Sequence, residues 1–470
     1  MGVFEMEGFV KRFGLIALAL VTVCASAQQA AWTVKPGWVK AHEVFLASDA
    51  MRGRGSATHD EEITATYVAS RFVSYGLQLA PGMKDYVQAA EVVSTVLDGH
   101  ATLTAGTVKL EEGAGVTLLN SSGTSVSGTL VKLKAADVAG AKIPQGAVVV
   151  LMDVPDGQGF RKVIAPVMQS GPAAVVIPES ADSERMYQAA GGRARTPIRL
   201  ADQQARRPGS TIWALDASHM KMLEAASDGA AVKMQVNIVP MEKRYTYNAI
   251  GYLPGSDPNA GTILLSAHLD HLGVGTPENG DGIWNGANDD AAGTTAVLEL
   301  AHAMANAPKL KRSVLFVCYG SEELGDLGST YFGKHSPVPL KDMVANVEFE
   351  MIGNQDPKMP DGVLLFTGWE RSNLGPTLKE HGALLGPDPY PDQHYFERSD
   401  NYALALEGVV AHTAAGWGDP PTYHRPTDDL AHLNLPFMTA AIQSLVVPME
   451  WLANSDFKPQ WNAGGQPKRQ

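Results

Sequence analysis

The chain has 470 residues, of which 45% are hydrophobic and 19% charged, the range of an ordinary globular protein. This length predicts two or three domains. Its 37 basic and 50 acidic residues leave a net charge of −13, which argues against nucleic acid or an anionic membrane surface as the main partner. The two cysteines are too few for a disulfide framework.

The first 27 residues have the pattern of a secretory signal peptide. Lys11 and Arg12 precede an apolar run at 13–23, and Ala-Ser-Ala at 25–27 is a small-residue cleavage pattern. The apolar run is too short to cross a bilayer, which takes about 20 residues. We therefore expect cleavage after Ala27, loss of one of the two cysteines, and a secreted or periplasmic protein.

Two different sequence patterns follow the expected signal peptide. Residues 36–80 carry apolar side chains at helix-like spacing, and we assign 28–115 to the first part of the main domain. Residues 116–239 change to short β-rich runs separated by Gly, Pro and polar residues, which predicts an inserted β-rich domain.

Beyond residue 240, apolar strands alternate with helices. Strands are expected at 262–267, 313–317, 344–349, 363–367 and 408–412, with helices between several of them, notably at 291–306. This alternation predicts an α/β domain at 240–455, with a mixed, largely parallel sheet covered by helices. A last helix is expected at 435–454, followed by a frayed tail at 456–470.

Histidine and acidic side chains follow the expected strands, at the edge where ligands collect in open α/β sheets. Two histidines, one shared aspartate and two further carboxylates would give each of two metal ions three protein ligands, a donor set that suits zinc. One of two adjacent glutamates can bind metal while the other takes a proton from water. The candidates are His268, Asp270, His271, Asp289, Asp290, Glu322, Glu323, Glu348, Glu350, His424, Asp428 and Asp429.

Five segments of this part of the chain carry a family resemblance. They are Ala-His-Leu-Asp-His at 267–271, Gly-Ala-Asn-Asp-Asp-Ala-Ala-Gly at 286–293, Ser-Glu-Glu at 321–323, Glu-Met-Ile-Gly at 350–353 and Tyr-His-x-Pro-x-Asp-Asp at 423–429. In order and spacing they resemble the M28 family of zinc metallopeptidases. By texture and position, residues 116–239 also resemble the protease-associated domain that many members insert before the first metal histidine.

The resemblance implies a pair of zinc ions bridged by Asp289. His268 and Glu350 would complete one coordination sphere, and Glu323 and His424 the other. In this family Glu350 would normally be an aspartate, so the carboxylate here is one methylene longer.

The resemblance also implies roles beside the metals. Glu322 would be the general base, and Tyr423 would donate a hydrogen bond to the tetrahedral oxyanion. Asp270, two residues after His268, would orient that ring.

Several neighbouring residues have competing interpretations. Glu348 would share a strand face with Glu350, which we prefer because it precedes the Met-Ile-Gly turn. Asp290 could replace Asp289 as the bridge, or lie at the start of a helix as a charge favourable to its dipole. His271 is expected to be a solvated loop histidine, and Arg52-Gly-Arg54 a solvated basic turn.

The sequence therefore predicts a secreted dizinc exopeptidase, an aminopeptidase that cleaves peptides through a metal-bridging water. A carboxypeptidase or dipeptidase remains open and would need Arg398 or Arg371 to bind the substrate carboxylate. A glutaminyl cyclase-like acyltransferase with one zinc and a non-catalytic binding homologue also remain. Cobalt or manganese would fit the same ligands. The expected partners are peptides, with neither nucleic acid nor, after leader removal, a membrane.

Overall fold

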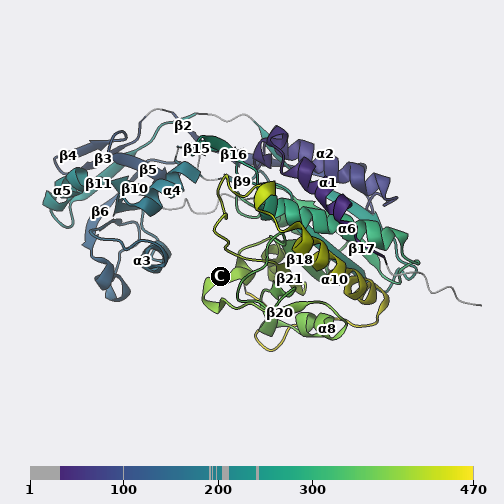
Figure 1. Cartoon of the computed structure of the whole chain (residues 1–470). Coiled ribbons are helices and arrows are strands. Elements are labelled where there is room, and N and C mark those ends of the chain that lie inside the picture. The colour runs from purple at the N-terminus through teal and green to yellow at the C-terminus, as the bar shows by residue number, and fades with distance from the viewer. Residues whose placement is uncertain are drawn as a thin grey trace, which may run out of the picture. The chain divides into compact units, whose positions relative to one another are not determined.

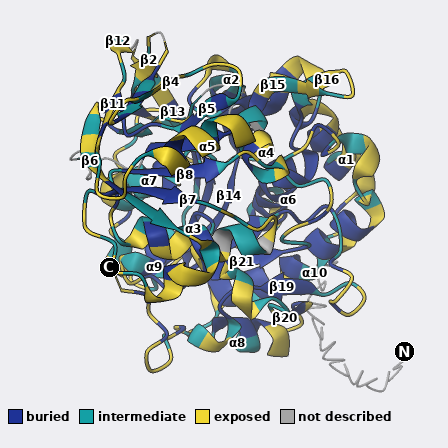
Figure 2. Cartoon of the chain, turned by 90° about the vertical axis from the view of Figure 1, so that its left-hand side faces the viewer, coloured by how far each residue is buried: buried dark blue, intermediate teal, exposed yellow. Residues whose placement is uncertain are grey.

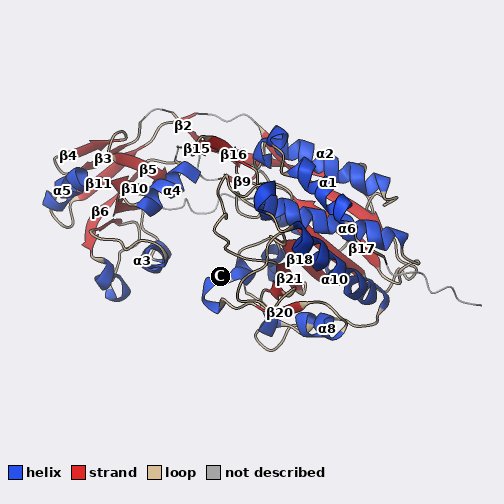
Figure 3. Cartoon of the chain, viewed as in Figure 1, coloured by secondary structure: helices blue, strands red, loops and turns tan. Residues whose placement is uncertain are grey.

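The computed structural model describes residues 32–468, apart from 99, 190, 191, 193, 197, 204–210 and 240–242. The expected leader at 1–27, with its cleavage after Ala27, lies outside the described residues. The described residues form a nine-stranded sheet, an eight-stranded sheet and two short two-stranded ribbons (Figures 1 and 3).

The nine-stranded sheet has the order β20-β19-β21-β18-β14-β17-β13-β1-β9. Its central pairs β17-β14, β14-β18 and β18-β21 are parallel, and β13, β1 and β9 extend it with antiparallel pairings. The expected mixed sheet with a parallel centre is confirmed. Its strands are β1 Val87–Ser94, β9 Ile198–Leu200, β13 Arg244–Leu253, β14 Thr262–His268, β17 Ser313–Tyr319, β18 Met343–Glu350, β19 Leu364–Phe366, β20 Leu385–Pro387 and β21 Ala411–Ala415.

The centre of this sheet is covered on both faces. Every residue of β14 and β17 is buried, and Figure 2 shows the burial along β14. Successive side chains of a strand point to opposite faces, so both faces are covered. Continuous apolar runs such as Thr-Ile-Leu-Leu at 262–265 are typical of such strands. β21 begins three residues later than the strand expected at 408–412.

Helices supply this cover. α6 contacts β14, β17 and β18, and α1 and α10 pack on α6, while α2 lies against β13. α7 and α9 pack with Leu264 and Leu315 in another buried cluster. The helices of this part are α1 Pro36–Leu46, α2 His59–Ser74, α6 Ala292–Asn306, α7 Leu327–His335, α8 Leu374–Glu380, α9 Asn401–Leu406 and α10 Leu435–Asn454.

The eight-stranded sheet has the order β4-β3-β11-β6-β7-β8-β10-β5, with parallel pairs from β6 to β10. It starts at Thr102, so the boundary expected at 116 falls inside it, because the alternating strands β3 and β4 lack the dense apolar runs that follow. Its strands are β3 Thr102–Ala105, β4 Val108–Glu111, β5 Val116–Asn120, β6 Val126–Leu133, β7 Val148–Leu151, β8 Ala174–Pro178, β10 Thr211–Leu215 and β11 Ala231–Gln235. This part also contains α3 Gln158–Gln169, α4 Ala181–Ala189 and α5 Ala217–Ala225, and the ribbons are β2 Val96–Leu97 with β12 Ile238–Val239 and β15 Gly273–Glu278 with β16 Asp281–Trp284.

The C-terminal helix is where the sequence predicts it, but the described part of the tail after it is not frayed. α10 has the expected bounds, and it is long and apolar enough by composition to cross a membrane, but 56% of its most apolar stretch is buried and it packs on α6, α1 and β14. It is therefore a core helix. The expectation of a frayed tail is wrong for the described residues up to 468. Trp461 forms a β-bridge with Ser372 and packs beside Phe396 and His412, which anchors the tail.

Candidate active site

The parallel strands bring four predicted site residues to one edge of the sheet. His268 is the last residue of β14 and Glu350 the last of β18. Glu322 and Glu323 lie in the turn that follows β17. Because these three strands are parallel neighbours, their carboxyl ends meet at the same edge.

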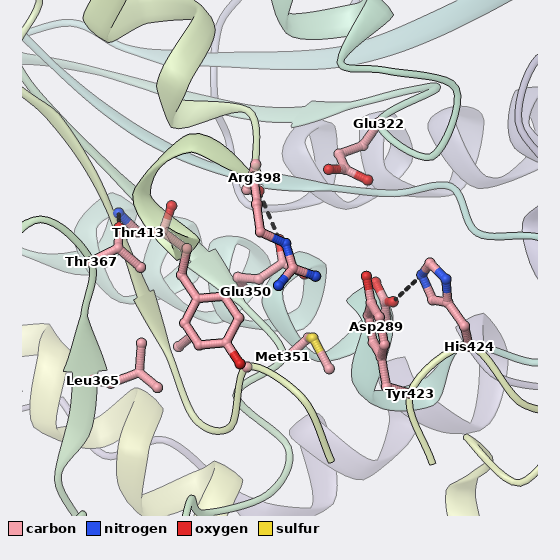
Figure 4. Close-up of a pocket in the computed structure, with 14 residues that line it drawn as sticks. Asp289, Glu322, Glu350, Met351, Leu365, Thr367, Arg398, Thr413, Tyr423 and His424 are labelled. Carbon is pink, nitrogen blue, oxygen red and sulfur yellow. Dashed lines mark hydrogen bonds and ion pairs between the residues drawn. The ribbon is translucent and has the colours of Figure 1, made fainter. Parts of the chain in front are cut away.

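The carboxylate of Asp289 lies between two histidines. Its Oδ1 is 3.2 Å from His268 Nε2, and its Oδ2 is 3.2 Å from His424 Nε2. Each histidine also faces a second carboxylate: His268 Nε2 is 3.3 Å from Glu350 Oε1, and His424 Nε2 is 3.2 Å from Glu323 Oε2. Two histidine–carboxylate pairs therefore share the Asp289 carboxylate. Figure 4 shows Asp289 beside His424 and Glu350. A pair of metal ions with one bridging carboxylate requires this arrangement.

The electrostatics of the five side chains favour bound cations. Burial by itself lowers the pKa of His424, but the charges of Glu323 and Asp289 outweigh it and raise that pKa to about 10. The pKa of His268 is likewise raised, against burial, chiefly by Glu350. The carboxylates thus keep the two histidines protonated at neutral pH. A bound metal ion would take the place of these protons and supply the positive charge instead.

Unsatisfied polar atoms supply an independent test of fit for a metal. His271 Nδ1 and Glu323 Oε1 are 2.9 Å apart, yet neither has a properly aligned hydrogen bond among the described residues, and both are buried. Lone pairs that converge in this way suit a cation between them. His271 is fully buried and lies 3.8 Å from Asp289 Oδ2, so the expectation of a solvated loop histidine is wrong.

Asp290 lies close to the same groups, and one of its two oxygens binds the backbone. Its ligand oxygen is within 4.8 Å of those of His268 and Glu350. Its Oδ1, however, accepts hydrogen bonds from the amides of Gly293, at 2.8 Å, and Met351, at 2.9 Å. Asp290 therefore holds the start of α6 against the end of β18.

Glu322 is placed by a carboxylate behind it. Asp270 Oδ1 accepts from the Glu322 amide at 3.0 Å, and Oδ2 accepts from Ser56 Oγ at 2.5 Å. Burial raises the pKa of Glu322 well above its usual range. The Nδ1 of His268 hydrogen-bonds the main-chain oxygen of Asp270 at 3.2 Å and lies 3.7 Å from its carboxylate. Asp270 thus contacts both the turn and the ring.

Tyr423 stacks on His424 and lines the same cavity as Glu322. The two rings lie 3.9 Å apart. Burial, with help from the charges of Asp289 and Glu323, raises the pKa of Tyr423 well above its usual range. Its hydroxyl therefore keeps its proton and can donate a hydrogen bond into the cavity.

Glu348 and Glu350 share a strand face but differ in surroundings. Glu348 is fully buried and accepts hydrogen bonds from Ser399 Oγ, Thr413 Oγ1 and the Asn401 amide, each at 2.8 Å. Glu350 also accepts from Ser399, at 2.9 Å, and keeps its other oxygen toward His268. The single hydroxyl proton of Ser399 can serve either carboxylate, and Glu350 is the one that faces the cavity.

The two arginines that could bind a substrate carboxylate, and the arginine of the expected basic turn, lie in different environments. Arg398 lines the cavity, over the ring of Tyr395. Arg371 instead pairs with Glu370 and Glu397 and donates to Gly465 O. Arg54 is fully buried, so the expected solvated turn is wrong at this residue. No local pattern around Arg54 or His271 signals burial, because the groups that bury them come from distant segments.

Comparison with known proteins bears on the same residues. The family model described as peptidase family M28 matches residues 248–447, which contain all five of the converging side chains. Residues 248–447 thus match peptidase family M28. The expected family is confirmed.

Curated relatives agree with this match. The chain is 28% identical over 209 residues to leupeptin-inactivating enzyme 1 of Streptomyces exfoliatus, covering 40% of this chain and 44% of that protein. It is 26% identical to aminopeptidase YwaD of Bacillus subtilis, covering 44% and 46%. The chain thus spans about half the length of these curated relatives.

Solved structures share the fold over most of the chain. The aminopeptidase from Aneurinibacillus sp. strain AM-1 superposes with a TM-score of 0.59 at 20% identity, covering 90% of this chain and 94% of that one. The zinc aminopeptidase BSAP from Bacillus subtilis gives 0.54 at 18% identity, covering 90% and 96%. At these identities the likeness establishes the fold.

Proposed function

We propose that this M28 chain is a dizinc aminopeptidase that removes amino-terminal residues from peptides. The observation that carries the proposal is the Asp289 carboxylate, with one oxygen 3.2 Å from each of His268 and His424. The buried Glu323 Oε1, which lacks a hydrogen bond among the described residues, supports a cation in the same place. Several curated relatives and solved neighbours are named as aminopeptidases, one of them as a zinc aminopeptidase.

The metal ligands in this proposal are His268 and Glu350 for one ion, His424 and Glu323 for the other, and Asp289 for both. Zinc bound there would acidify the attacking water and polarise the scissile carbonyl. Imidazole and carboxylate donors fit zinc, and their charges hold positive charge at the site.

The side chains beside the ligands carry out the proton transfers. Glu322, whose pKa is raised by burial, takes a proton from the attacking water and delivers it to the leaving amine. Tyr423 keeps its proton and donates a hydrogen bond to the carbonyl oxygen as negative charge develops on it. The backbone amide of Glu322 is held by Asp270, which fixes the base near the cavity.

The cavity suits an amino-terminal residue. Glu322 and Glu350 line it beside Asp289 and offer carboxyl oxygens to a substrate ammonium group. Met351, Leu365 and Ala415 line it with apolar surface that can receive a side chain.

The proposal is tested with Glu322→Gln on aminoacyl p-nitroanilides in the presence of zinc. Loss of the base lowers kcat by about 10²- to 10⁴-fold while two zinc ions per chain remain bound. Glu111→Gln, on exposed β4, is the matched control and keeps wild-type kcat. Wild-type kcat in Glu322→Gln would disprove the assignment of the base.

Arg398 favours a second candidate, a carboxypeptidase or dipeptidase. It lines the cavity, and no described carboxylate lies within ion-pair distance of its guanidinium. An aminopeptidase cleaves peptides with a blocked carboxyl end and leaves those with a blocked amino end intact. The opposite preference, with KM raised for free carboxylates in Arg398→Gln, would favour the second candidate.

The organisation we propose is a leader at 1–27 removed on export and a peptidase domain interrupted by a protease-associated-like insert. β1 and β13 pair antiparallel through six residue pairs, although about 150 residues separate them. The eight-stranded sheet lies in the sequence between them, as an insertion between paired strands requires.

A further inference from the structure

A buried arginine lies beneath the loop that carries Asp289. The Arg54 side chain is fully buried, and all three of its nitrogens donate to main-chain oxygens. Nη1 donates to Asn285 O at 2.6 Å, and Nη2 donates to Gly286 O at 2.7 Å and to Asp289 O at 3.4 Å. Three carbonyl groups of one short loop thus converge on a single guanidinium.

The same arginine also holds the loop that carries His268. Its Nε donates to Leu269 O at 2.9 Å, and its main-chain oxygen accepts from the His271 amide at 3.1 Å. Nη1 reaches Leu46 O, at the end of α1, at 2.9 Å. Arg54 therefore joins the segment after β14 to the segment before α6, and so joins two sets of ligands.

Asp428 binds the amide groups of the Asp289 loop, whereas Arg54 binds its carbonyl groups. Its Oδ1 accepts from the Asn288 amide at 2.8 Å and its Oδ2 from the Asp289 amide at 3.0 Å. Its own main-chain oxygen accepts from the Ala287 amide at 3.0 Å. Asp428 is 1% exposed. The loop is thus held by carbonyl groups on Arg54 and by amide groups on Asp428.

The local backbone is built for this contact. Gly53 has φ +68°, and a Cβ there would lie 2.3 Å from Trp284 O, so only glycine lets the turn approach that strand. Gly286 has φ +60°, and a Cβ there would lie 2.3 Å from Asp289 O. A planar guanidinium with five N–H donors fits several fixed carbonyls at once, which a lysine ammonium cannot do.

We propose that Arg54 and Asp428 are positioning residues that clamp loop 285–289 against loop 268–271 and thereby set the spacing of the metal ligands. Neither side chain is assigned as a ligand or as part of the proton transfer. No described acidic side chain lies within ion-pair distance of Arg54, so its hydrogen bonds go to the backbone of the ligand loops. The inference rests on the proposed metal site.

Arg312 offers a matched control for the test. It is 1% exposed and also donates to three main-chain oxygens, those of Ala260, Leu452 and Phe457, but at a place remote from the ligand loops. Arg54→Lys and Arg312→Lys each remove a buried guanidinium that binds backbone. Any difference between them in metal binding therefore reports on the ligand loops rather than on general stability.

The experiment measures zinc affinity by competition with a chromophoric chelator, with thermal unfolding of each variant as reference. We expect zinc affinity about tenfold or more weaker in Arg54→Lys, the size usual for residues that orient metal ligands, and unchanged in Arg312→Lys. The cobalt-loaded Arg54→Lys protein should also show an altered visible spectrum, which a loss of stability alone does not cause.

Asp428→Asn provides a second variant if Arg54→Lys does not fold, since an amide oxygen can accept fewer of the loop amides. It should also weaken zinc binding by about tenfold. Equal zinc affinity in wild type and in whichever of the two variants folds would overturn the clamp. A wild-type protein that binds no zinc would instead overturn the proposed function, so the two failures are distinguishable.

Discussion

The carboxylate of Glu350 contacts two different side chains. Its Oε1 faces His268 Nε2 at 3.3 Å, and its Oε2 accepts from Ser399 Oγ at 2.9 Å. Ser399 can donate instead to Glu348, which is buried behind it. The longer side chain at this position therefore reaches the histidine while it stays bonded to Ser399.

Shortening this side chain should weaken one metal site selectively. We expect Glu350→Asp to lose either the His268 contact or the Ser399 bond, and to bind one of two zinc ions about tenfold more weakly. Glu350→Gln, which keeps the length and removes the charge, should weaken that site further. Zinc titration with elemental analysis measures both, and two equally tight sites in Glu350→Asp would contradict the role given to its length.

Residues in short motifs were accessible to prediction, whereas residues buried by distant segments were not. His268 and Glu350 end apolar strands, so their place at one edge follows from the alternation of strands and helices. Arg54 and His271 look like polar loop residues because their partners, such as Asn285 and Glu323, come from other loops. Their burial depends on packing that no local pattern records.

At the scale of elements, one buried carboxyl joins two helices. Glu43 of α1 accepts from Thr295 Oγ1 of α6 at 2.8 Å and is fully buried. Burial raises the pKa of Glu43 to about 8, although the Thr295 bond opposes the shift. In the folded protein the side chain is therefore neutral at pH 7, whereas in the unfolded chain it is ionised.

This difference predicts a pH-dependent contribution to stability. Below about pH 4.5 Glu43 is protonated in both states, and between there and about pH 8 only the folded state keeps the proton, so stability falls as pH rises. The difference in unfolding free energy between Glu43→Gln and wild type should rise, in favour of the variant, by up to about 1.4 kcal/mol per pH unit from pH 5 to 8. Above pH 8 this difference should stay constant. Glu111→Gln should run parallel to wild type, and a constant gap in Glu43→Gln would contradict the shift.

Element positions were predictable where apolar runs are continuous. The helix at 435–454 has its expected bounds, and β14 ends one residue beyond its expected end. β21 starts late because Val409 and Val410 extend the apolar run ahead of the paired residues. β3 and β4 alternate polar and apolar residues and pair with each other. β3 also pairs with β11, far along the chain, so their sheet could not be read locally.

At the scale of the whole molecule, the net charge of −13 includes acids gathered on the candidate metal site. Asp289, Glu323 and Glu350 lie around two histidines at 3.2–3.3 Å, and Glu322 lies in the same cavity. Without a cation, protons on the histidines offset their mutual repulsion. Metal binding should therefore contribute to the stability of the fold as well as to its chemistry.

Removal of metal should accordingly lower the melting temperature of the full chain. Zinc at a hundredfold excess over its Kd stabilises a folded protein by about 2.7 kcal/mol for each site, because the unfolded chain lacks the assembled ligands. We expect chelator-treated protein to melt a few degrees lower and zinc to restore the loss, whereas magnesium, which prefers oxygen ligands, should not. His424→Ala should lose part of the zinc response, and His381→Ala, on an exposed helix end, should keep all of it. Identical melting with and without zinc in the wild-type chain would contradict the link between the acidic site and stability.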